Sequence, residues 1–375
     1  MEPISESELS EAIAGAEGPL RIVGGGTRPV GGPVAGEVLS TARLTGIVDY
    51  EPGALTLVVK AGTPLAEVER VLAAEGQRLP FEPMDHRGLL GTGGEPTVGG
   101  VAAANVSGPR RIQVGAARDF MLGVRFVDGM GRVLKNGGRV MKNVTGYDLV
   151  KLMAGSRGTL GVLSEVSFKV LPQAEAQATL ILHGLEPEAA VTAMAEALGS
   201  PYDVSGAAYF PQTVGDGAET MIRLEGFAAS VAYRLERLKA HFAARAETDT
   251  VEGEVSAKAW AAVRDVDVLH GVDGEIWRIS VKPSDAPRVL AALPEGAAGC
   301  LDWGGGLIWV ACAVGTDLRA ALTGIGGHAT LVRASGARRA EMPAFHPEPA
   351  PVRMISQGLR GRFDPREILN PGLMG

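Results

Sequence analysis

The sequence TVGGVAAANVSGPRR, from Thr97 to Arg111, carries almost no side-chain bulk before its final arginines. A glycine pair and a run of alanines make up most of it. Small residues let a backbone approach a flat or charged ligand closely, and glycine turns where other residues clash. One interpretation is therefore that the backbone of this stretch forms a binding surface. The other is a glycine-rich loop followed by a helix that packs tightly against its neighbour.

A second glycine-rich stretch, RIVGGGTRPV from Arg21 to Val30, begins as a short strand and continues into three consecutive glycines. A dinucleotide-binding fingerprint of the G-x-G-x-x-G type would need glycine where Pro29 stands, so that motif is excluded. Successive N–H groups in such a turn can point into one concavity and bind phosphate oxygens. Thr27 adds a hydroxyl donor. A plain tight turn is the alternative.

A third stretch is longer: MKNVTGYDLVKLMAGSRGTLGVLSEVSFKVLP, from Met141 to Pro172. Together with the first two stretches and the ending RFDPREILNPGLM, from Arg362 to Met374, it resembles the FAD-binding domain of the vanillyl-alcohol oxidase family, which is of the PCMH type. Within that family the third stretch is very similar to the smaller flavin subunit of bacterial glycolate oxidase, or glycolate dehydrogenase. The resemblance covers the first half of the chain and its last dozen residues well, and the middle poorly.

The resemblance implies that these stretches bind FAD. In the family, the glycine loop of the second stretch holds the pyrophosphate, the first stretch lines the flavin ring and the ribityl–pyrophosphate chain, and the third contacts the adenine end. Some members attach the flavin to a histidine in the loop that holds the pyrophosphate; this chain has none there, so we expect non-covalent FAD. The residues at matching positions are Gly24, Gly25, Gly26, Thr27, Arg28, Thr97, Gly99, Gly100, Asn105, Gly108, Gly158, Gly161, Val162 and Asn370. A helix entry beside the flavin is matched by Lys142, Asn143, Gly146, Tyr147 and Asp148, although Tyr147 also fits a core aromatic residue.

The order of the expected elements indicates an α+β fold. Strands and helices within residues 1–174 fit the two-lobed PCMH-type FAD-binding domain that the resemblance implies. Residues 175–336 show a repeated β–α–β pattern with paired strands, typical of ferredoxin-like units, and predict an α+β cap domain over the flavin. Residues 337–375 are a tail that, by the resemblance, returns to the flavin site. Ser5 with Glu8 predicts a capping box, and Thr63 with Pro64 predicts a helix start in which Thr63 is the N-cap.

Composition narrows the classes of function. The chain has 375 residues, is 46% hydrophobic and carries a formal charge of −7, so a nucleic-acid partner is not expected. There is no apolar run of ~20 residues that would predict a membrane span. The beginning of the sequence shows no signal-peptide pattern, so we expect a cytoplasmic protein that reaches the inner membrane only through partners. Cys300 and Cys312 form no CxxC motif and are expected to be buried free thiols, and no metal site is expected.

Flavin oxidation of a 2-hydroxy acid needs a C–H bond facing flavin N5, a base for the hydroxyl proton and a cation for the carboxylate. His346 is a candidate base, with an exposed loop histidine as the alternative. Arg333, Arg353 and Arg110 are candidates for the carboxylate. Arg110 and Arg111 could also balance phosphate or be solvated surface charges. The catalytic residues therefore stay undetermined at this level.

The resemblance implies a flavin subunit of a hetero-oligomeric glycolate dehydrogenase, which takes part in oxidising glycolate, a small 2-hydroxy acid, to glyoxylate. It implies two partners, a second FAD-binding subunit and an iron–sulfur subunit that receives electrons. The larger flavin subunit and its relatives carry a His-x-His motif that binds a metal, and this chain has none. Two alternatives remain open: a stand-alone FAD-dependent oxidase or dehydrogenase of another hydroxy acid or alcohol, and a non-catalytic assembly subunit that has lost its flavin.

Overall fold

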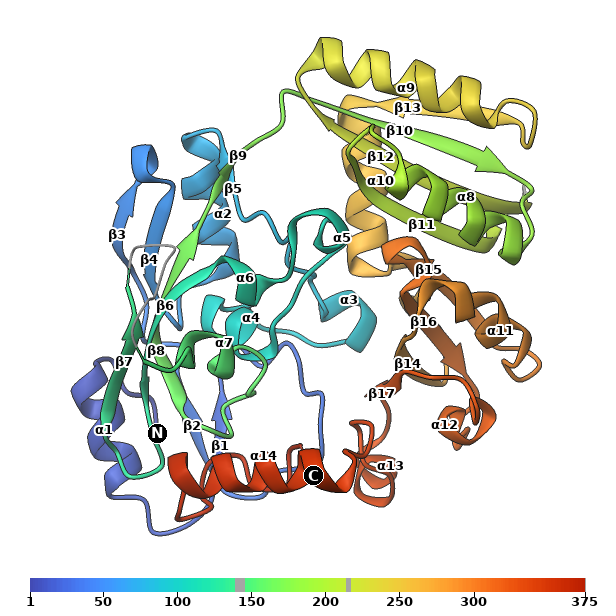
Figure 1. Cartoon of the computed structure of the whole chain (residues 1–375). Helices are drawn as coiled ribbons and strands as arrows, with labels where there is room; N and C mark the ends of the chain where they lie inside the picture. Colours follow the sequence, from blue (N-terminus) through green and yellow to red (C-terminus); the bar gives the residue numbers. More distant parts are fainter. Residues whose placement is uncertain (139–145, 214–216, 375) are drawn as a thin grey trace.

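The computed structural model describes residues 1–138, 146–213 and 217–374. Residues up to Pro172 form an N-terminal lobe, and residues 176–333 form a cap lobe beside it (Figure 1). The remaining segment, from residue 334 onward, leaves the cap lobe and runs back along the N-terminal lobe (Figure 1). None of the helices in the described ranges is long and apolar enough to cross a membrane.

The described part of the N-terminal lobe contains two small sheets of two strands each and a larger sheet of five strands. One small sheet pairs β1 (Leu20–Val23) in parallel with β2 (Glu37–Ser40), beside α1 (Glu6–Ala14). The larger one is an antiparallel five-stranded sheet in the order β3-β4-β8-β6-β7. Its strands are β3 (Ile47–Glu51), β4 (Thr56–Lys60), β8 (Val162–Lys169), β6 (Met121–Val127) and β7 (Val133–Gly137). The other elements of this lobe are α2 (Leu65–Ala74), α3 (Arg87–Leu90), α4 (Val98–Ala104), α5 (Arg111–Val114), α6 (Ala117–Phe120), α7 (Leu149–Met153) and the short pair β5 (Gln77–Arg78) with β9 (Leu171–Pro172).

Two predicted helix starts have different outcomes. The Ser5 hydroxyl accepts a hydrogen bond from the amide of Glu8, as a capping box requires, but the Glu8 carboxylate accepts from the amide of Ile4 instead of Ser5. The prediction that Thr63 caps the next helix is wrong. Helix α2 begins at Leu65 with no side-chain cap, because the buried Thr63 hydroxyl accepts a hydrogen bond from the amide of Gly46, at 2.9 Å, and holds the loop before β3.

The cap lobe is a single eight-stranded sheet in the order β13-β10-β12-β11-β15-β16-β14-β17. Its first half follows the chain order β–α–β–β–α–β, and so does its second half, which makes two ferredoxin-like units side by side. The first unit comprises β10 (Ala176–His183), α8 (Pro187–Gly199), β11 (Val204–Thr213), β12 (Gly217–Gly226), α9 (Ala228–Phe242) and β13 (Thr248–Glu252). The second comprises β14 (Glu275–Ser280), α11 (Ala286–Ala291), β15 (Ala298–Asp302), β16 (Leu307–Cys312), α12 (Leu318–Ala321) and β17 (His328–Arg333). The predicted α+β class and ferredoxin-like pattern are confirmed, with two units in one sheet.

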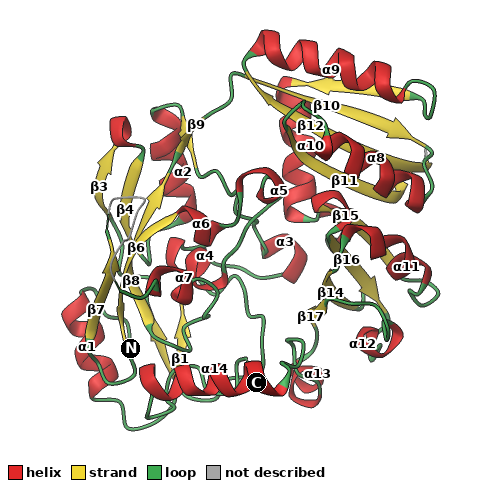
Figure 2. Cartoon of the chain, in the orientation of Figure 1, coloured by secondary structure: helices red, strands yellow, loops and turns green. Residues whose placement is uncertain are grey.

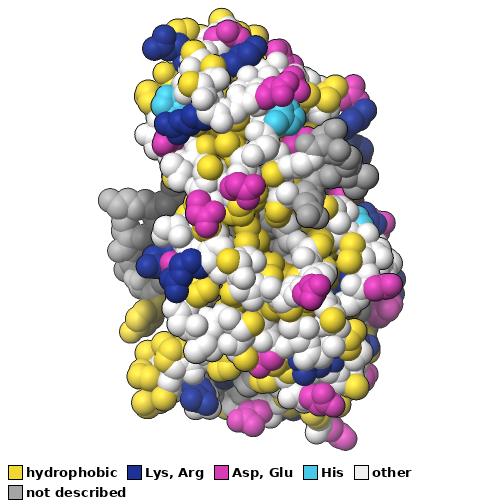
Figure 3. All heavy atoms as spheres, turned by 90° about the vertical axis from the view of Figure 1, so that its right-hand side faces the viewer, with side chains coloured by type: hydrophobic (Ala, Val, Ile, Leu, Met, Phe, Trp, Pro, Cys, Tyr) yellow, Lys and Arg dark blue, Asp and Glu magenta, His cyan; other side chains and the backbone are white. Residues whose placement is uncertain are grey.

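The two faces of the cap sheet pack against different partners. In β16, Leu307 and Trp309 belong to the hydrophobic core of the N-terminal lobe, whereas the intervening Ile308 and Val310 pack with residues of α8 and α11. The helices α8, α9, α11 and α12 lie away from the N-terminal lobe in Figure 2. Successive side chains of β16 therefore pack alternately into the core of the cap and into the junction between the lobes. On the outer face of the cap, acidic and basic side chains are interspersed (Figure 3).

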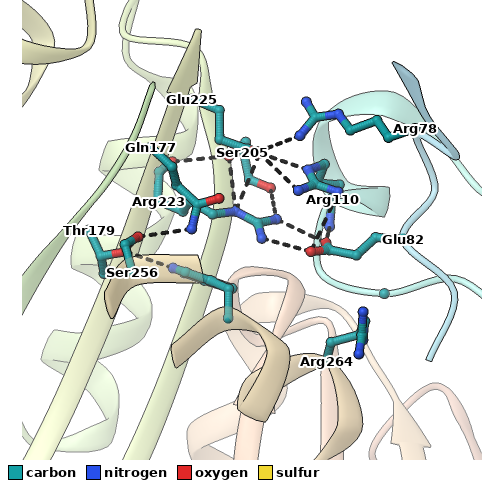
Figure 4. A network of polar contacts seen from close by, with 12 residues as sticks. Arg78, Glu82, Arg110, Gln177, Thr179, Ser205, Arg223, Glu225, Ser256 and Arg264 are labelled. Carbon is teal, nitrogen blue, oxygen red and sulfur yellow. Dashed lines mark hydrogen bonds and ion pairs between the residues drawn. The ribbon is translucent and has the colours of Figure 1, made fainter. Parts of the chain in front are cut away.

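A buried charge network joins the lobes (Figure 4). The N-terminal lobe contributes Arg78, Glu82 and Arg110, and strand β12 of the cap contributes Arg223 and Glu225. Arg223 lies 2.9 Å from Glu82, Arg110 lies 2.8 Å from Glu225, and Arg78 lies 2.6 Å from Glu225. The Arg223 side chain has no exposed surface. Each carboxylate thus meets a guanidinium from the other lobe, which fixes the cap in register on the N-terminal lobe.

Replacing Glu225 with Gln leaves Arg78 and Arg110 without this carboxylate. Removing one partner of a buried ion pair costs about 3–5 kcal/mol, so we expect the free energy of unfolding in urea to fall by about that amount. Burial by itself would raise the pKa of Glu225, but Arg223 and Arg110 outweigh it and the pKa lies below the ordinary value. The stabilisation is therefore present above the unfolded carboxyl pKa of about 4.3, and the difference between the two proteins should shrink as the pH falls below it.

The matched control is Glu254→Gln, which removes an exposed pair with Lys258. It should change the free energy of unfolding by less than about 1 kcal/mol. Equal losses for the two variants would show that the network does not hold the lobes together.

Candidate functional site

A cavity of about 440 Å³ lies in the N-terminal lobe, where three glycine-rich segments meet. Its walls are the loop after β1, the first turns of α4 and the turn before β8, and the C-terminal segment contributes Asn370 and Leu373. The sequence-predicted residues that line it are Gly24, Gly25, Gly26, Thr27, Arg28, Thr97, Gly99, Gly100, Gly158, Gly161, Val162 and Asn370. Residues far apart in the chain are thus brought to one concave surface.

The loop after β1 presents consecutive backbone donors. Within the described parts of the chain, the amides of residues 24 to 28 donate to no backbone or side-chain acceptor. Successive amides of this kind form an anion-binding concavity. Close packing is a second reason why glycine is required here. A Cβ on Gly25 would lie 1.6 Å from the carbonyl oxygen of Glu95, and one on Gly94 would lie 2.2 Å from the carbonyl oxygen of Gly25. At Gly25 the absent side chain serves the contact between two backbones.

The stretch from residue 97 to residue 111 combines both interpretations of its small residues. Thr97 begins helix α4, and its hydroxyl accepts a hydrogen bond from the amide of Gly100 at 3.2 Å. The helix packs tightly on the strand behind it, since a Cβ on Gly99 would lie 2.6 Å from that of Ala61. The same helix forms a wall of the cavity, so tight packing and a ligand-facing backbone occur together.

Two predicted cofactor residues do not line the cavity. Asn105 ends α4 with a positive φ of 49°, and its side-chain oxygen accepts from the amide of Arg118. The amide of Gly108 donates to Phe81, and its carbonyl accepts from the indole N–H of Trp303 in the cap at 3.1 Å. Both residues therefore hold the chain around the cavity and the cap.

Asn370 ties the C-terminal segment to two cavity walls. Its Oδ1 accepts from the amide of Ile22 at 2.7 Å, and its Nδ2 donates to the carbonyl of Arg157 at 2.9 Å. Leu369 forms a parallel bridge with Leu20, which extends the small sheet of the N-terminal lobe. The return of the tail thus sets the distance between the loop after β1 and the turn before β8.

Arg28 and Arg157 line the cavity and form no ion pair among the described residues. Arg28 donates to the carbonyl of Gly100 at 3.2 Å, and the guanidinium of Arg157 stacks 4.8 Å from the ring centre of Phe345. Burial lowers the pKa of Arg28 to about 10, with a smaller effect from Arg157, and burial lowers the pKa of Arg157 to about 10. Both remain charged at neutral pH. Together with the loop amides they fit a ligand that carries phosphate groups.

The predicted catalytic candidates lie outside the cavity wall. The ring Nδ1 of His346 accepts from the amide of Ala329 at 3.4 Å. Arg333 donates to the backbone carbonyls of Leu89, at 2.9 Å, and Val272. Of the other candidate cations, Arg353 is exposed on α14 (Ala350–Phe363), Arg110 pairs with Glu225 and Arg111 stacks on Trp303. Tyr147 is 87% exposed and is not a core residue. Lys142 and Asn143 lie outside the described residues.

A second cationic group was not predicted from the sequence. Arg278 on β14 faces the N-terminal lobe, stacked 5.1 Å from the ring of Trp303, and has no carboxylate partner in the described ranges. The pKa of Arg278 is lowered to about 10, mainly by burial and to a smaller extent by the positive charges of Arg111 and Arg157. His86 lies nearby with Nδ1 3.3 Å from the Met84 carbonyl, and burial, then Arg28, holds its pKa well below the ordinary value. No set of three His, Cys, Asp or Glu side chains among the described residues could hold a metal ion.

This fold and cavity define a class, the flavoproteins with a PCMH-type FAD-binding domain. The family model for the FAD binding domain matches residues 1–137. Over 370 residues the chain is 36% identical to the glycolate oxidase subunit GlcE of Escherichia coli, with 98% of this chain and 95% of that protein covered. The chain belongs to this family of FAD-dependent oxidoreductases.

Other similarities agree with that family. The glycolate oxidase subunit GlcD of Bacillus subtilis is 32% identical over 157 residues, which cover 42% of this chain and 31% of GlcD. The 4-ethylphenol oxidase of Gulosibacter chungangensis superposes with a TM-score of 0.71 at 13% identity, covering 100% of this chain and 88% of the oxidase. The expected two-lobed FAD-binding domain with a ferredoxin-like cap is thereby confirmed, and so is FAD as the cofactor.

Substituting methionine for Arg28 or Arg157 removes a cation and keeps much of the side-chain volume. A hydrogen bond to a charged group contributes about 1.5–3 kcal/mol, so we expect the dissociation constant of FAD to rise about tenfold to hundredfold. The ratio of flavin to protein absorbance after purification and a titration of the apoprotein with FAD would measure it. Arg70→Met, at an exposed position on α2, is the control and should bind FAD as the wild type does. Unchanged affinity in both test variants would contradict the assignment.

Proposed function

We propose that this chain is the FAD-binding subunit of a hetero-oligomeric glycolate dehydrogenase and takes part in oxidising glycolate to glyoxylate. The observation that carries the proposal is the 36% identity to GlcE along 95% of that subunit. The cavity supports it, because its amides and arginines suit the cofactor that such a subunit needs. We also propose the division into residues 1–174 for FAD binding, residues 175–336 for the cap and residues 337–375 for the returning tail.

Bound FAD would supply the oxidised ring that accepts a hydride from the substrate. In this proposal the amides of residues 24 to 28 and the guanidinium of Arg28 hold the phosphates. Asn370 keeps the surrounding walls in place. None of the described residues that line the cavity is a histidine, which favours non-covalent attachment.

The chain also offers groups for a substrate at the junction of the lobes. Arg278 is a cation without a carboxylate partner in the described ranges, and a 2-hydroxy acid would bring one. His86 is neutral at pH 7, because burial and the nearby arginines lower its pKa, so it can accept a proton from a hydroxyl group. We propose Arg278 and His86 as the substrate-facing pair, in place of Arg333, Arg353 and His346.

The proposed partners are a second FAD-binding subunit and an iron–sulfur subunit that receives the electrons. The chain contains only two cysteines, Cys300 and Cys312, and both are buried free thiols. A cysteine-ligated cluster needs four thiolates, so it would belong to another chain. We propose a cytoplasmic location, with contact to the inner membrane made through these partners.

Anaerobic addition of glycolate tests the proposal in both the isolated chain and the assembled complex. If Arg278 binds the carboxylate, Arg278→Met should raise the KM for glycolate about tenfold to hundredfold, because one charged hydrogen bond is lost. Loss of flavin absorbance and reduction of an artificial electron acceptor are the measurements. Arg288→Met, at an exposed pair with Asp285 in the cap, is the matched control.

The outcomes separate the alternatives. Bleaching of the isolated chain by a different hydroxy acid or alcohol would indicate a stand-alone enzyme. A colourless chain within an active complex would indicate an assembly subunit. A coloured chain with a normal KM in Arg278→Met would place the substrate chemistry on another subunit.

A further inference from the structure

Helix α14 is attached to the molecule mainly through its C-terminal half. The ring of Phe363 lies 6.0 Å from that of Phe126, and the Phe363 carbonyl accepts from the amide of Gly129 at 2.8 Å. Leu359 also packs against the core of the N-terminal lobe. Yet none of the 14 residues of α14 is buried. The helix therefore lies on the surface, with one end anchored.

The large apolar side chains of its N-terminal half point to solvent. Val352, Met354 and Ile355 are 47%, 70% and 66% exposed. Val352, Ile355 and Leu359 follow one another at spacings of three and four residues, so they form one stripe along the helix. The core of the N-terminal lobe covers this stripe only at Leu359. A neighbouring group of hydrophobic side chains on a monomer surface indicates an interaction site more often than scattered single residues do.

The charge on α14 is of one sign. Between residues 350 and 363 the helix carries Arg353, Arg360 and Arg362 and no Asp or Glu, although the whole chain has a net charge of −7. Arginine and methionine are enriched at protein interfaces, and complementary charge steers association. The matching surface is therefore apolar in its centre with acidic side chains around it. In Figure 3, hydrophobic side chains gather at the lower left edge, at the level of α14.

The position of α14 connects this surface with the flavin site. The helix is preceded by Phe345, which stacks on Arg157 in the cavity wall, and followed by Asn370 and Leu373, which line the cavity. Both segments that flank α14 thus touch the cofactor cavity. A protein seated on this helix would therefore contact the lobe that contains the cofactor cavity.

We propose that the N-terminal half of α14 is the docking surface for the second FAD-binding subunit of the redox complex, through an apolar patch with an acidic rim on that subunit. The inference rests on the proposed function and specifies where its partner binds. A bilayer with anionic lipids would also attract a cationic helix. Helix α14 contains no Trp or Lys, residues typical of interfacial membrane helices, which favours a protein partner.

The test uses the full chain and a GlcD-type subunit from the same organism, co-expressed with the remaining subunits. Met354→Glu combined with Ile355→Glu, and separately Arg353→Glu, should weaken co-purification and the measured dissociation constant at least about tenfold. FAD content should remain that of the wild type. Phe227→Glu combined with Val314→Glu is the matched control, since these cap residues are 78% and 74% exposed.

The possible failures are distinguishable. If the wild-type chain assembles and both α14 variants assemble equally well, only the docking surface is wrong. If the variants keep the complex but lose binding to vesicles of anionic phospholipid, the helix binds a membrane and the inference is overturned. If the wild-type chain itself assembles with no subunit, the proposed function fails and this inference with it.

Discussion

The side-chain amide of Asn370 ties the C-terminal segment to residues that lie 348 and 213 positions earlier in the chain. One end accepts from Ile22 and the other donates to Arg157, so the loop after β1 and the turn before β8 are kept at a fixed separation. The cofactor cavity exists between these two walls, and its donors are useful only at that spacing. The returning tail is therefore part of the binding site, although it follows the whole cap lobe in the sequence.

Two sets of arginines near the cavity and the junction of the lobes differ in what faces them. Arg78, Arg110 and Arg223 meet Glu82 and Glu225 and connect the lobes. The second set forms no ion pair in the described part of the chain and faces the cavity or the junction beside it; it includes Arg28, Arg111, Arg157 and Arg278. Paired cations fix geometry, whereas cations that lack a protein anion attract an anionic ligand. The protein thus concentrates positive charge at one place despite its net negative charge.

Sequence was sufficient where glycine spacing or hydrophobic alternation marks an element, as in the loop at Gly24 and the paired strands of the cap. It failed at Thr63, because the hydroxyl bonds to Gly46 across a tertiary contact that no local pattern reveals. It also missed Arg278, because the surroundings of this side chain form only when β14 meets the other lobe. The arrangement of two ferredoxin-like units side by side in one sheet became visible only with the strand order.

The contact between Gly25 and the backbone near Glu95 has a consequence for how divergence in such chains is interpreted. No side chain of any kind fits there, whatever the cavity contains. A descendant that no longer bound a dinucleotide would still have to keep that glycine in order to fold, whereas Arg28 and Arg157 would become free to drift. A chain that lost its flavin and kept only a structural role would therefore retain these glycines, and the loss would first be visible as substitutions of the cavity arginines.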